Sequence, residues 1–155
     1  MSTVEINQQM PDFTAAATSG QTVKLSTLKG QKVVIYFYPK DSTPGCTTEG
    51  QNFRDQHPAF AKANCVIFGV SRDSMTRHEN FKAKQAFPFE LISDEDESLC
   101  RLFDVIKEKN MYGRKAMGIE RSTFLIDEKG VLRQEWRKVS VKGHVDDVLE
   151  AVKGL

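Results

Sequence analysis

The chain has 155 residues, a formal net charge of +1, 39% hydrophobic residues and 28% charged residues. This length suffices for one hydrophobic core and is short for two, so we expect a single domain that spans residues 1–155. The balanced charge gives no bulk attraction to nucleic acid or membranes, and no apolar stretch approaches the roughly 18 to 20 residues that cross a bilayer. The N-terminal segment has neither the basic nor the apolar region of a signal peptide, which predicts a cytoplasmic protein.

Three cysteines, Cys46, Cys65 and Cys100, form an odd count at irregular spacing. This pattern argues against a disulfide framework and is typical of a reducing compartment. The chain has no C-x-x-C motif, and its three histidines do not have the spacing of metal ligands. We therefore expect three separate thiols, histidines at the surface of the protein, and neither a metal nor a cofactor.

Short β-branched runs alternate with helical segments along the chain, which predicts a partly parallel sheet covered by helices. Residues 13–17 and 22–25 flank a turn that contains Gly20, and we expect them to form an N-terminal β-hairpin. Residues 32–38 and 65–71 are continuous apolar runs. Such runs are typical of central strands that are buried on both faces.

The segment between these two central strands is predicted to be helical. Thr43 and Pro44 have the order of an N-cap and a first helical residue. The helix is expected to run to about Asn64, with an interruption or a kink near Pro58. Cys46 then lies in the first helical turn, at the carboxyl edge of the parallel strands, where α/β proteins place their sites.

The second half of the chain is expected to continue this alternation. It contains, in chain order, a helix, a strand, a short helix, an irregular segment, two strands joined by a turn, and a last helix, at residues 74–85, 89–93, 96–103, 107–120, 121–127, 131–138 and from about 144. This order is the one that a thioredoxin-like α/β sheet with an N-terminal extension would have.

Cys46 is the candidate nucleophile of the chain. The first turn of a helix offers unpaired N–H groups and the positive end of the helix dipole, and both stabilise a thiolate. Ionisation by itself yields only a small net gain in reactivity, because the nucleophilicity of a thiolate falls as its thiol becomes more acidic. Further catalysis requires groups that act on the electrophile, for which Thr43 and Arg121 are the candidates. An inert core cysteine is the alternative, which the polar neighbours at 41–51 disfavour.

Two distant segments of the chain resemble the peroxiredoxins. "FYPKDSTPGCTTE" matches the P-x-x-x-T-x-x-C signature of that family through Pro39, Thr43 and Cys46. "MYGRKAMGIERSTFLID" is similar to the second site segment of the bacterioferritin comigratory protein, or peroxiredoxin Q, subfamily. The resemblance covers about residues 10 to 152 and implies the peroxiredoxin type of the thioredoxin-like fold, with a central mixed sheet flanked by helices. It also implies a thiol-dependent peroxidase that reduces hydrogen peroxide and organic hydroperoxides through a Cys46 sulfenic acid.

The same resemblance implies a role for each matched residue. Cys46 would be the peroxidatic cysteine, and Thr43 would bond the incoming peroxide. Pro39 would shield the thiolate, Glu49 would orient the network, and Arg121 would pin the thiolate and the peroxide together.

The chain departs from the subfamily at one position that matters for recycling. Many members have a resolving cysteine five residues after the peroxidatic one, and here that position is Gln51. Cys65 is expected in the core at the opposite edge of the sheet, roughly 15 to 20 Å from Cys46. Cys100 is expected nearer the active edge but on a packed apolar face. We therefore expect a monomer with a one-cysteine mechanism, recycled by an external thiol such as thioredoxin, glutaredoxin or glutathione.

Three alternatives stay open at this stage. Cys100 could act as the resolving thiol of an atypical two-cysteine cycle. Cys46 could be the switch of a redox sensor or holdase that does not turn over. A thioredoxin-like disulfide reductase is disfavoured, because it needs a second thiol two or three residues from the first, and positions 47 to 49 are Thr, Thr and Glu.

Overall fold

The computed structural model describes residues 4–155, and a five-stranded mixed sheet lies at its centre. Its strands are β3 (Lys32–Phe37), β4 (Cys65–Ser71), β5 (Glu90–Ser93), β8 (Ser122–Ile126) and β9 (Leu132–Trp136). The order across the sheet is β5-β4-β3-β8-β9. Strands β3, β4 and β5 are mutually parallel, whereas β8 is antiparallel to both of its neighbours. The predicted pair of central strands is confirmed.

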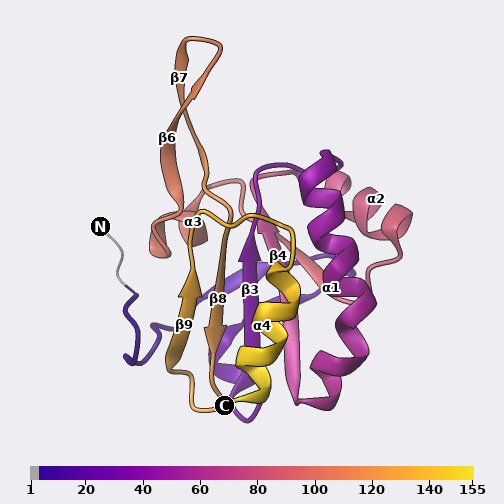
Figure 1. Cartoon of the computed structure of the whole chain (residues 1–155), viewed down its shortest axis with the longest axis vertical. Helices are drawn as coiled ribbons and strands as arrows, with labels where there is room; N and C mark the ends of the chain where they lie inside the picture. The colour runs from indigo at the N-terminus through magenta and orange to yellow at the C-terminus, as the bar shows by residue number, and fades with distance from the viewer. Residues whose placement is uncertain (1–3) are drawn as a thin grey trace.

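Helices cover both faces of this sheet (Figure 1). They are α1 (Pro44–Lys62), α2 (Met75–Gln85), α3 (Ser98–Leu102) and α4 (His144–Lys153), with a short 3₁₀ helix at Leu25–Leu28. Buried residues of α1, α2 and α4 form one apolar cluster with the sheet, and those of α3 belong to the cluster on the other side. Within residues 4–155, no helix is long and apolar enough to cross a bilayer.

The central strand β3 shows why both faces of the sheet are covered. Val33, Ile35 and Phe37 belong to the cluster that contains α3, whereas Val34 and Tyr36 belong to the cluster with α1, α2 and α4. Successive side chains of a strand point to opposite faces, so a strand that is apolar at every position must be covered twice. The carboxyl end of β3 then leads directly into the start of α1 (Figure 1).

Two hairpins lie outside the central sheet. β1 (Thr14–Ala16) pairs with β2 (Thr22–Lys24), which confirms the predicted N-terminal hairpin. β6 (Ile106–Met111) pairs with β7 (Arg114–Ile119), and this hairpin projects beyond the rest of the molecule (Figure 1). The prediction of an irregular segment at 107–120 is therefore wrong. A projecting hairpin has little apolar surface to bury, so its strands lack the hydrophobic alternation that identifies a strand in a sequence.

The start of α1 follows the prediction in position but differs in its hydrogen bonds. Thr43 is the N-cap residue and Pro44 the first helical residue. The Thr43 hydroxyl donates to the carbonyl of Lys40 (2.8 Å) and does not cap the helix. Pro58 lies within α1, which continues without interruption to Lys62.

Close contact between α1 and the segment before β5 depends on a glycine. Gly50 lies in α1 against the ring of Phe87, and a Cβ atom at Gly50 would come within 2.4 Å of that ring. Because the interior is close-packed, an added methyl group there must displace the ring or the helix.

We expect Gly50→Ala to lower the free energy of unfolding by about 1–3 kcal/mol, because the new methyl group overpacks this contact. Urea denaturation of the variant and the wild type measures the difference. Gly154→Ala is the control, since a Cβ at Gly154 would make only ordinary contacts at 3.6 Å. Equal stability of Gly50→Ala and the wild type would contradict this close packing.

Candidate active site

Cys46 lies in the first turn of α1, and only 2% of it is exposed. Arg121 Nη2 donates to the Cys46 sulfur at 3.4 Å. The first N–H groups of a helix have no partner within the helix, so their dipoles also point toward this turn. The thiol therefore lies next to both a cation and the start of a helix. The polar residues around Cys46 in the sequence disfavour a core position, yet the structure buries the cysteine.

Glu49 lies on the same side of α1 as Cys46 because the two are three residues apart. The buried residues Cys46, Glu49, Gly50 and Phe53 follow helical spacing, so a carboxyl group is part of an otherwise apolar stripe. Arg121 Nη1 donates to Glu49 Oε1 at 2.6 Å. One guanidinium thus bridges the carboxylate and the thiol, and its two nitrogens fix its orientation.

Arg121 reaches α1 because of the topology of the sheet. It directly precedes β8, and the first residue of β8, Ser122, pairs with Phe37 at the end of β3. Gly45 leaves the guanidinium room, since a Cβ atom there would lie 3.2 Å from Arg121 Nη2. Two segments 75 residues apart in sequence are brought together in this way.

The polar groups close to Glu49 are incompletely paired. Among the side chains that the structure describes, Glu49 Oε2 and Tyr36 Oη are buried without a hydrogen-bond partner. Burial raises the pKa of the Glu49 carboxyl to about 7, although Arg121 acts in the opposite direction. Burial also raises the pKa of the Tyr36 phenol, and the charge of Glu49 adds to this effect. A carboxyl group next to the thiol therefore titrates near neutral pH.

Thr43 and Pro39 lie in the segment that joins β3 to α1, and both are half-buried. The hydrogen of the Thr43 hydroxyl is used by the Lys40 carbonyl, so its oxygen keeps lone pairs that can accept a hydrogen bond. Within the described residues, no hydrogen bond joins Thr43 to Cys46. The structure thus links the thiol, the carboxylate and the guanidinium directly, and it places Thr43 and Pro39 in the segment that leads to them.

Comparison with known proteins identifies the family. Residues 6–135 match the model of the AhpC/TSA family. The chain is 58% identical over 142 residues to Peroxiredoxin Bcp of Xanthomonas campestris, covering 92% of this chain and 89% of that protein. It is 52% identical over 153 residues to Peroxiredoxin Bcp of Bacillus subtilis, covering 99% and 98%. This chain is a peroxiredoxin of the AhpC/TSA family.

Solved structures of similar proteins share the fold. Peroxiredoxin Q of Xanthomonas campestris superimposes with a TM-score of 0.88 at 57% identity, covering 92% of this chain and 90% of that one. A cysteine-to-serine mutant of Xylella fastidiosa PrxQ superimposes with a TM-score of 0.93 at 43% identity, covering 99% and 98%. The chain therefore has the peroxiredoxin type of the thioredoxin-like fold, and its activity is that of a thiol-dependent peroxidase.

The other two thiols of this peroxiredoxin lie away from Cys46. Cys65 opens β4 opposite Lys32, at the end of β3 that is remote from α1, and burial raises its pKa to about 12. Its predicted place in the core is confirmed. Cys100 is fully buried in α3, in the apolar cluster on the other side of the sheet from the cluster that contains Cys46. Burial and a nearby carboxylate, Asp94, raise the pKa of the Cys100 thiol.

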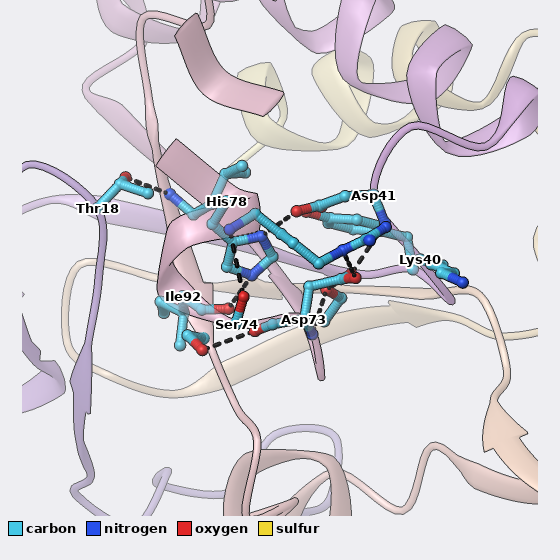
Figure 2. Close-up of polar contacts among 12 residues, drawn as sticks. Thr18, Lys40, Asp41, Asp73, Ser74, His78 and Ile92 are labelled. Atoms are coloured by element: carbon cyan, nitrogen blue, oxygen red, sulfur yellow. Dashed lines mark hydrogen bonds and ion pairs between the residues drawn. The ribbon is translucent and has the colours of Figure 1, made fainter. Parts of the chain in front are cut away.

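Two of the histidines are buried, so the prediction that all three lie at the surface is wrong. His78 is 0% exposed, with Nδ1 2.6 Å from Asp41 Oδ2 and Nε2 2.9 Å from the Ile92 carbonyl (Figure 2). His144 is 5% exposed, and its Nε2 lies 2.7 Å from Thr123 Oγ1. The partners come from other elements, so no spacing of residues along the chain could have indicated these sites.

A basic hollow lies beside Arg121. It is lined by Lys107, Glu108, Lys109, Glu120, Arg121, Lys138 and Val139. Burial and the charge of Arg121 lower the pKa of Lys109, while Cys46 acts in the opposite direction. Strand β6 therefore brings a second cation into the electrostatic environment of the thiol. The position of this lysine in a hairpin follows only from the structure, because the sequence predicts an irregular segment at 107–120.

The Glu49 carboxyl is expected to make the stability depend on pH. Its pKa of about 7 in the folded protein lies above its ordinary value of 4.5, so the folded state keeps a proton that the unfolded state has released between these values. The free energy of unfolding of the wild type, relative to Glu49→Gln, should therefore fall as pH rises from about 5 to about 7, by at most about 1.4 kcal/mol per pH unit. Urea denaturation of both proteins across this range measures the difference, and a constant difference would contradict the assignment.

Proposed function

We propose that this peroxiredoxin reduces hydrogen peroxide and organic hydroperoxides through a sulfenic acid on Cys46, and that a thiol from solution restores the cysteine. One arrangement carries the proposal: Arg121 lies 3.4 Å from the Cys46 sulfur while Glu49 holds its other nitrogen at 2.6 Å. A bacterioferritin comigratory protein of Xanthomonas campestris, 52% identical over 99% of this chain, is described by its alkyl peroxide reduction activity. That likeness supports an organic hydroperoxide as a substrate here.

The proposed reaction transfers one oxygen atom to sulfur. The Cys46 thiolate attacks the hydroxyl oxygen of the hydroperoxide, a sulfur–oxygen bond forms, and the oxygen–oxygen bond breaks. The leaving oxygen takes a proton and departs as an alcohol, or as water from hydrogen peroxide. Sulfur is oxidised to the sulfenic acid, and the peroxide is reduced.

Each proposed site residue acts on a different part of this reaction. Arg121 stabilises the charge that passes from sulfur to the leaving oxygen, and Glu49 holds the guanidinium in place. Thr43 accepts the hydrogen of the peroxide, since its own hydroxyl hydrogen is used by a backbone carbonyl. Pro39 limits the access of water to Cys46 from the segment that precedes α1.

Recycling by an external thiol follows from where the cysteines lie. A disulfide requires Cα atoms within about 7 Å of each other. Gln51 stands at the position of the usual resolving cysteine, and its amide donates to Gln85 (2.9 Å). Cys100 belongs to the cluster on the other side of the sheet, which disfavours two-cysteine recycling. Thioredoxin, glutaredoxin or glutathione would reduce the sulfenate. We propose that the enzyme is a cytoplasmic monomer with one domain, and that it uses no cofactor.

The roles of Thr43 and Arg121 predict a loss of rate that ionisation cannot explain. We expect Thr43→Val and Arg121→Ala each to lower the rate constant for peroxide by about 10² to 10³, the typical cost of removing one preorganised donor or acceptor. Stopped-flow kinetics gives the rate, and the ultraviolet absorbance of the thiolate gives its population in each variant. Thr48→Val, which alters an exposed hydroxyl on α1, is the control. A rate loss that simply tracks the thiolate population would contradict these roles.

The one-cysteine cycle predicts a sulfenate that persists until a thiol arrives. One equivalent of peroxide should leave a monomer with one dimedone-reactive group on Cys46, and excess peroxide without thiol should add two or three oxygen atoms there. Mass spectrometry of the intact protein distinguishes these products.

Serine variants separate the thiols. Cys46→Ser should lose peroxide consumption, whereas Cys65→Ser and Cys100→Ser should each keep most of it. Turnover by Cys46→Ser would overturn the assignment of the nucleophile. A quantitative disulfide between Cys46 and Cys100, with the loss of two hydrogen atoms, would overturn one-cysteine recycling, and a single turnover in the presence of thiols would instead indicate a redox sensor.

A further inference from the structure

A buried polar cluster lies at the segment that joins β3 to α1 (Figure 2). Asp41 of this segment is only 2% exposed and takes part in three hydrogen bonds, two of them to residues outside the segment. Its Oδ1 accepts from the hydroxyl of Tyr38 at 2.6 Å, and its Oδ2 lies 2.6 Å from Nδ1 of His78 in α2. Its backbone N–H donates to Asp73 Oδ2 at 2.8 Å. The residue is therefore held through its side chain and its backbone.

The cluster is closed by hydrogen bonds, which argues against a metal site. Potential ligand atoms of Asp41, Asp73 and His78 lie within 4.8 Å of one another. Both oxygens of Asp41 are already engaged by Tyr38 and His78, and Asp73 Oδ2 accepts from Ser71 as well as from the Asp41 backbone. A metal ion would have to displace these bonds, so we assign the cluster to hydrogen bonding.

The ring nitrogens of His78 both face acceptors. Nε2 lies 2.9 Å from the Ile92 carbonyl in β5, which can only accept, so Nε2 carries a hydrogen. Nδ1 faces a carboxylate oxygen, so another proton lies between His78 and Asp41. Whichever atom holds this proton, the pair has no net charge, which is a condition for placing two ionisable groups in a fully buried position. His78 thus connects β5 to the segment before α1.

The position of Asp41 determines the geometry around Thr43. The residue between them, Ser42, has a φ of 64°, a left-handed conformation that residues with a side chain adopt only when their surroundings hold them. On the other side of Asp41, the Lys40 carbonyl accepts the hydrogen of the Thr43 hydroxyl at 2.8 Å. A fixed Asp41 therefore fixes both the turn and the carbonyl that orient this hydroxyl.

We propose that His78 is a positioning residue for the peroxidase reaction: acting through Asp41, it holds residues 39–43 so that the Thr43 oxygen faces the peroxide as an acceptor. The proposal rests on the proposed function, because it assigns His78 an effect on the reaction of Cys46 with peroxide. The two hydrogen bonds of the His78 ring go to Asp41 and Ile92 and not to Cys46 or Arg121, so its effect must pass through the segment that it holds.

The decisive variant is His78→Phe, which keeps an aromatic ring beside Tyr38 (ring centroids 6.3 Å apart) and removes both hydrogen bonds. We expect the rate constant for hydrogen peroxide to fall by about ten-fold or more, because displacement of a catalytic group by about 1 Å can cost up to about 10² in rate. The alkylation of Cys46 by iodoacetamide, which does not use Thr43, should stay the same or become faster. Equal slowing of both reactions, or an unchanged peroxide rate, would overturn the proposal.

A double-mutant cycle tests whether His78 acts through Thr43. In a Thr43→Val background, His78→Phe should have no more than about a two-fold further effect on the peroxide rate, because residues that act through one another are not additive. A full ten-fold loss in that background would overturn the proposed route. If His78→Phe does not fold, His78→Gln can be used in the same cycle, since its amide can donate to Asp41 but cannot replace both bonds.

Val152→Ala is the matched control for a general loss of stability. Val152 is fully buried in α4, so the variant loses packing in an element that carries none of the residues of this polar cluster. Its peroxide rate should equal that of the wild type. If it slows as much as His78→Phe at the same loss of stability, the positioning role is overturned. A wild-type protein that does not consume peroxide would instead overturn the proposed function itself.

Discussion

The contact of one guanidinium with a thiol and a buried carboxylate is the interaction on which the site depends. Glu49 has no exposure to solvent, so its negative charge would be costly without the nitrogen of Arg121 at 2.6 Å. The same guanidinium donates to Cys46 at 3.4 Å. Because Arg121 enters from β8 and the other two residues lie on α1, the contact also joins the helix to the sheet. A single side chain thus takes part both in the geometry of the proposed site and in the contact between α1 and the sheet.

The start of α1 is held from two directions. On one side, Arg121 binds the residues of the first turns. On the other side, Asp41 is bound by Tyr38 of its own segment, by His78 and by Asp73, so that the segment before the helix is tied to α2 and to the loop between β4 and α2. In the proposed reaction, a peroxide that meets Cys46 would therefore encounter groups whose positions are set before it binds. Preorganisation of this kind lowers the cost of orienting donors in the transition state.

The sheet itself separates the chemistry of the thiols. Cys46 and Cys100 belong to apolar clusters on opposite sides, and Cys65 lies at the far end of the central strands. Burial raises the pKa of both Cys65 and Cys100, which lowers the fraction of reactive thiolate in each. Cys46, the proposed nucleophile, thereby differs from the other two thiols in its position in the fold, although all three are buried.

Local signals in the sequence determined much of this arrangement. Continuous apolar runs identified the two central strands, and a threonine before a proline identified the start of α1, so Cys46 could be placed in a first helical turn. Periodicity and helix starts are short-range properties, and a sequence displays them directly. Only the tertiary structure decided three other features: the β6–β7 hairpin, the burial of His78, and the side of the sheet on which Cys100 is buried. Asp41 meets His78 across 37 residues, and contacts at such separations are set by strand order and leave no local pattern. Arg121 could be expected near Cys46, 75 residues away, because the segment around it resembles the second site segment of a peroxiredoxin, whereas its bonds to Cys46 and Glu49 came from the tertiary structure.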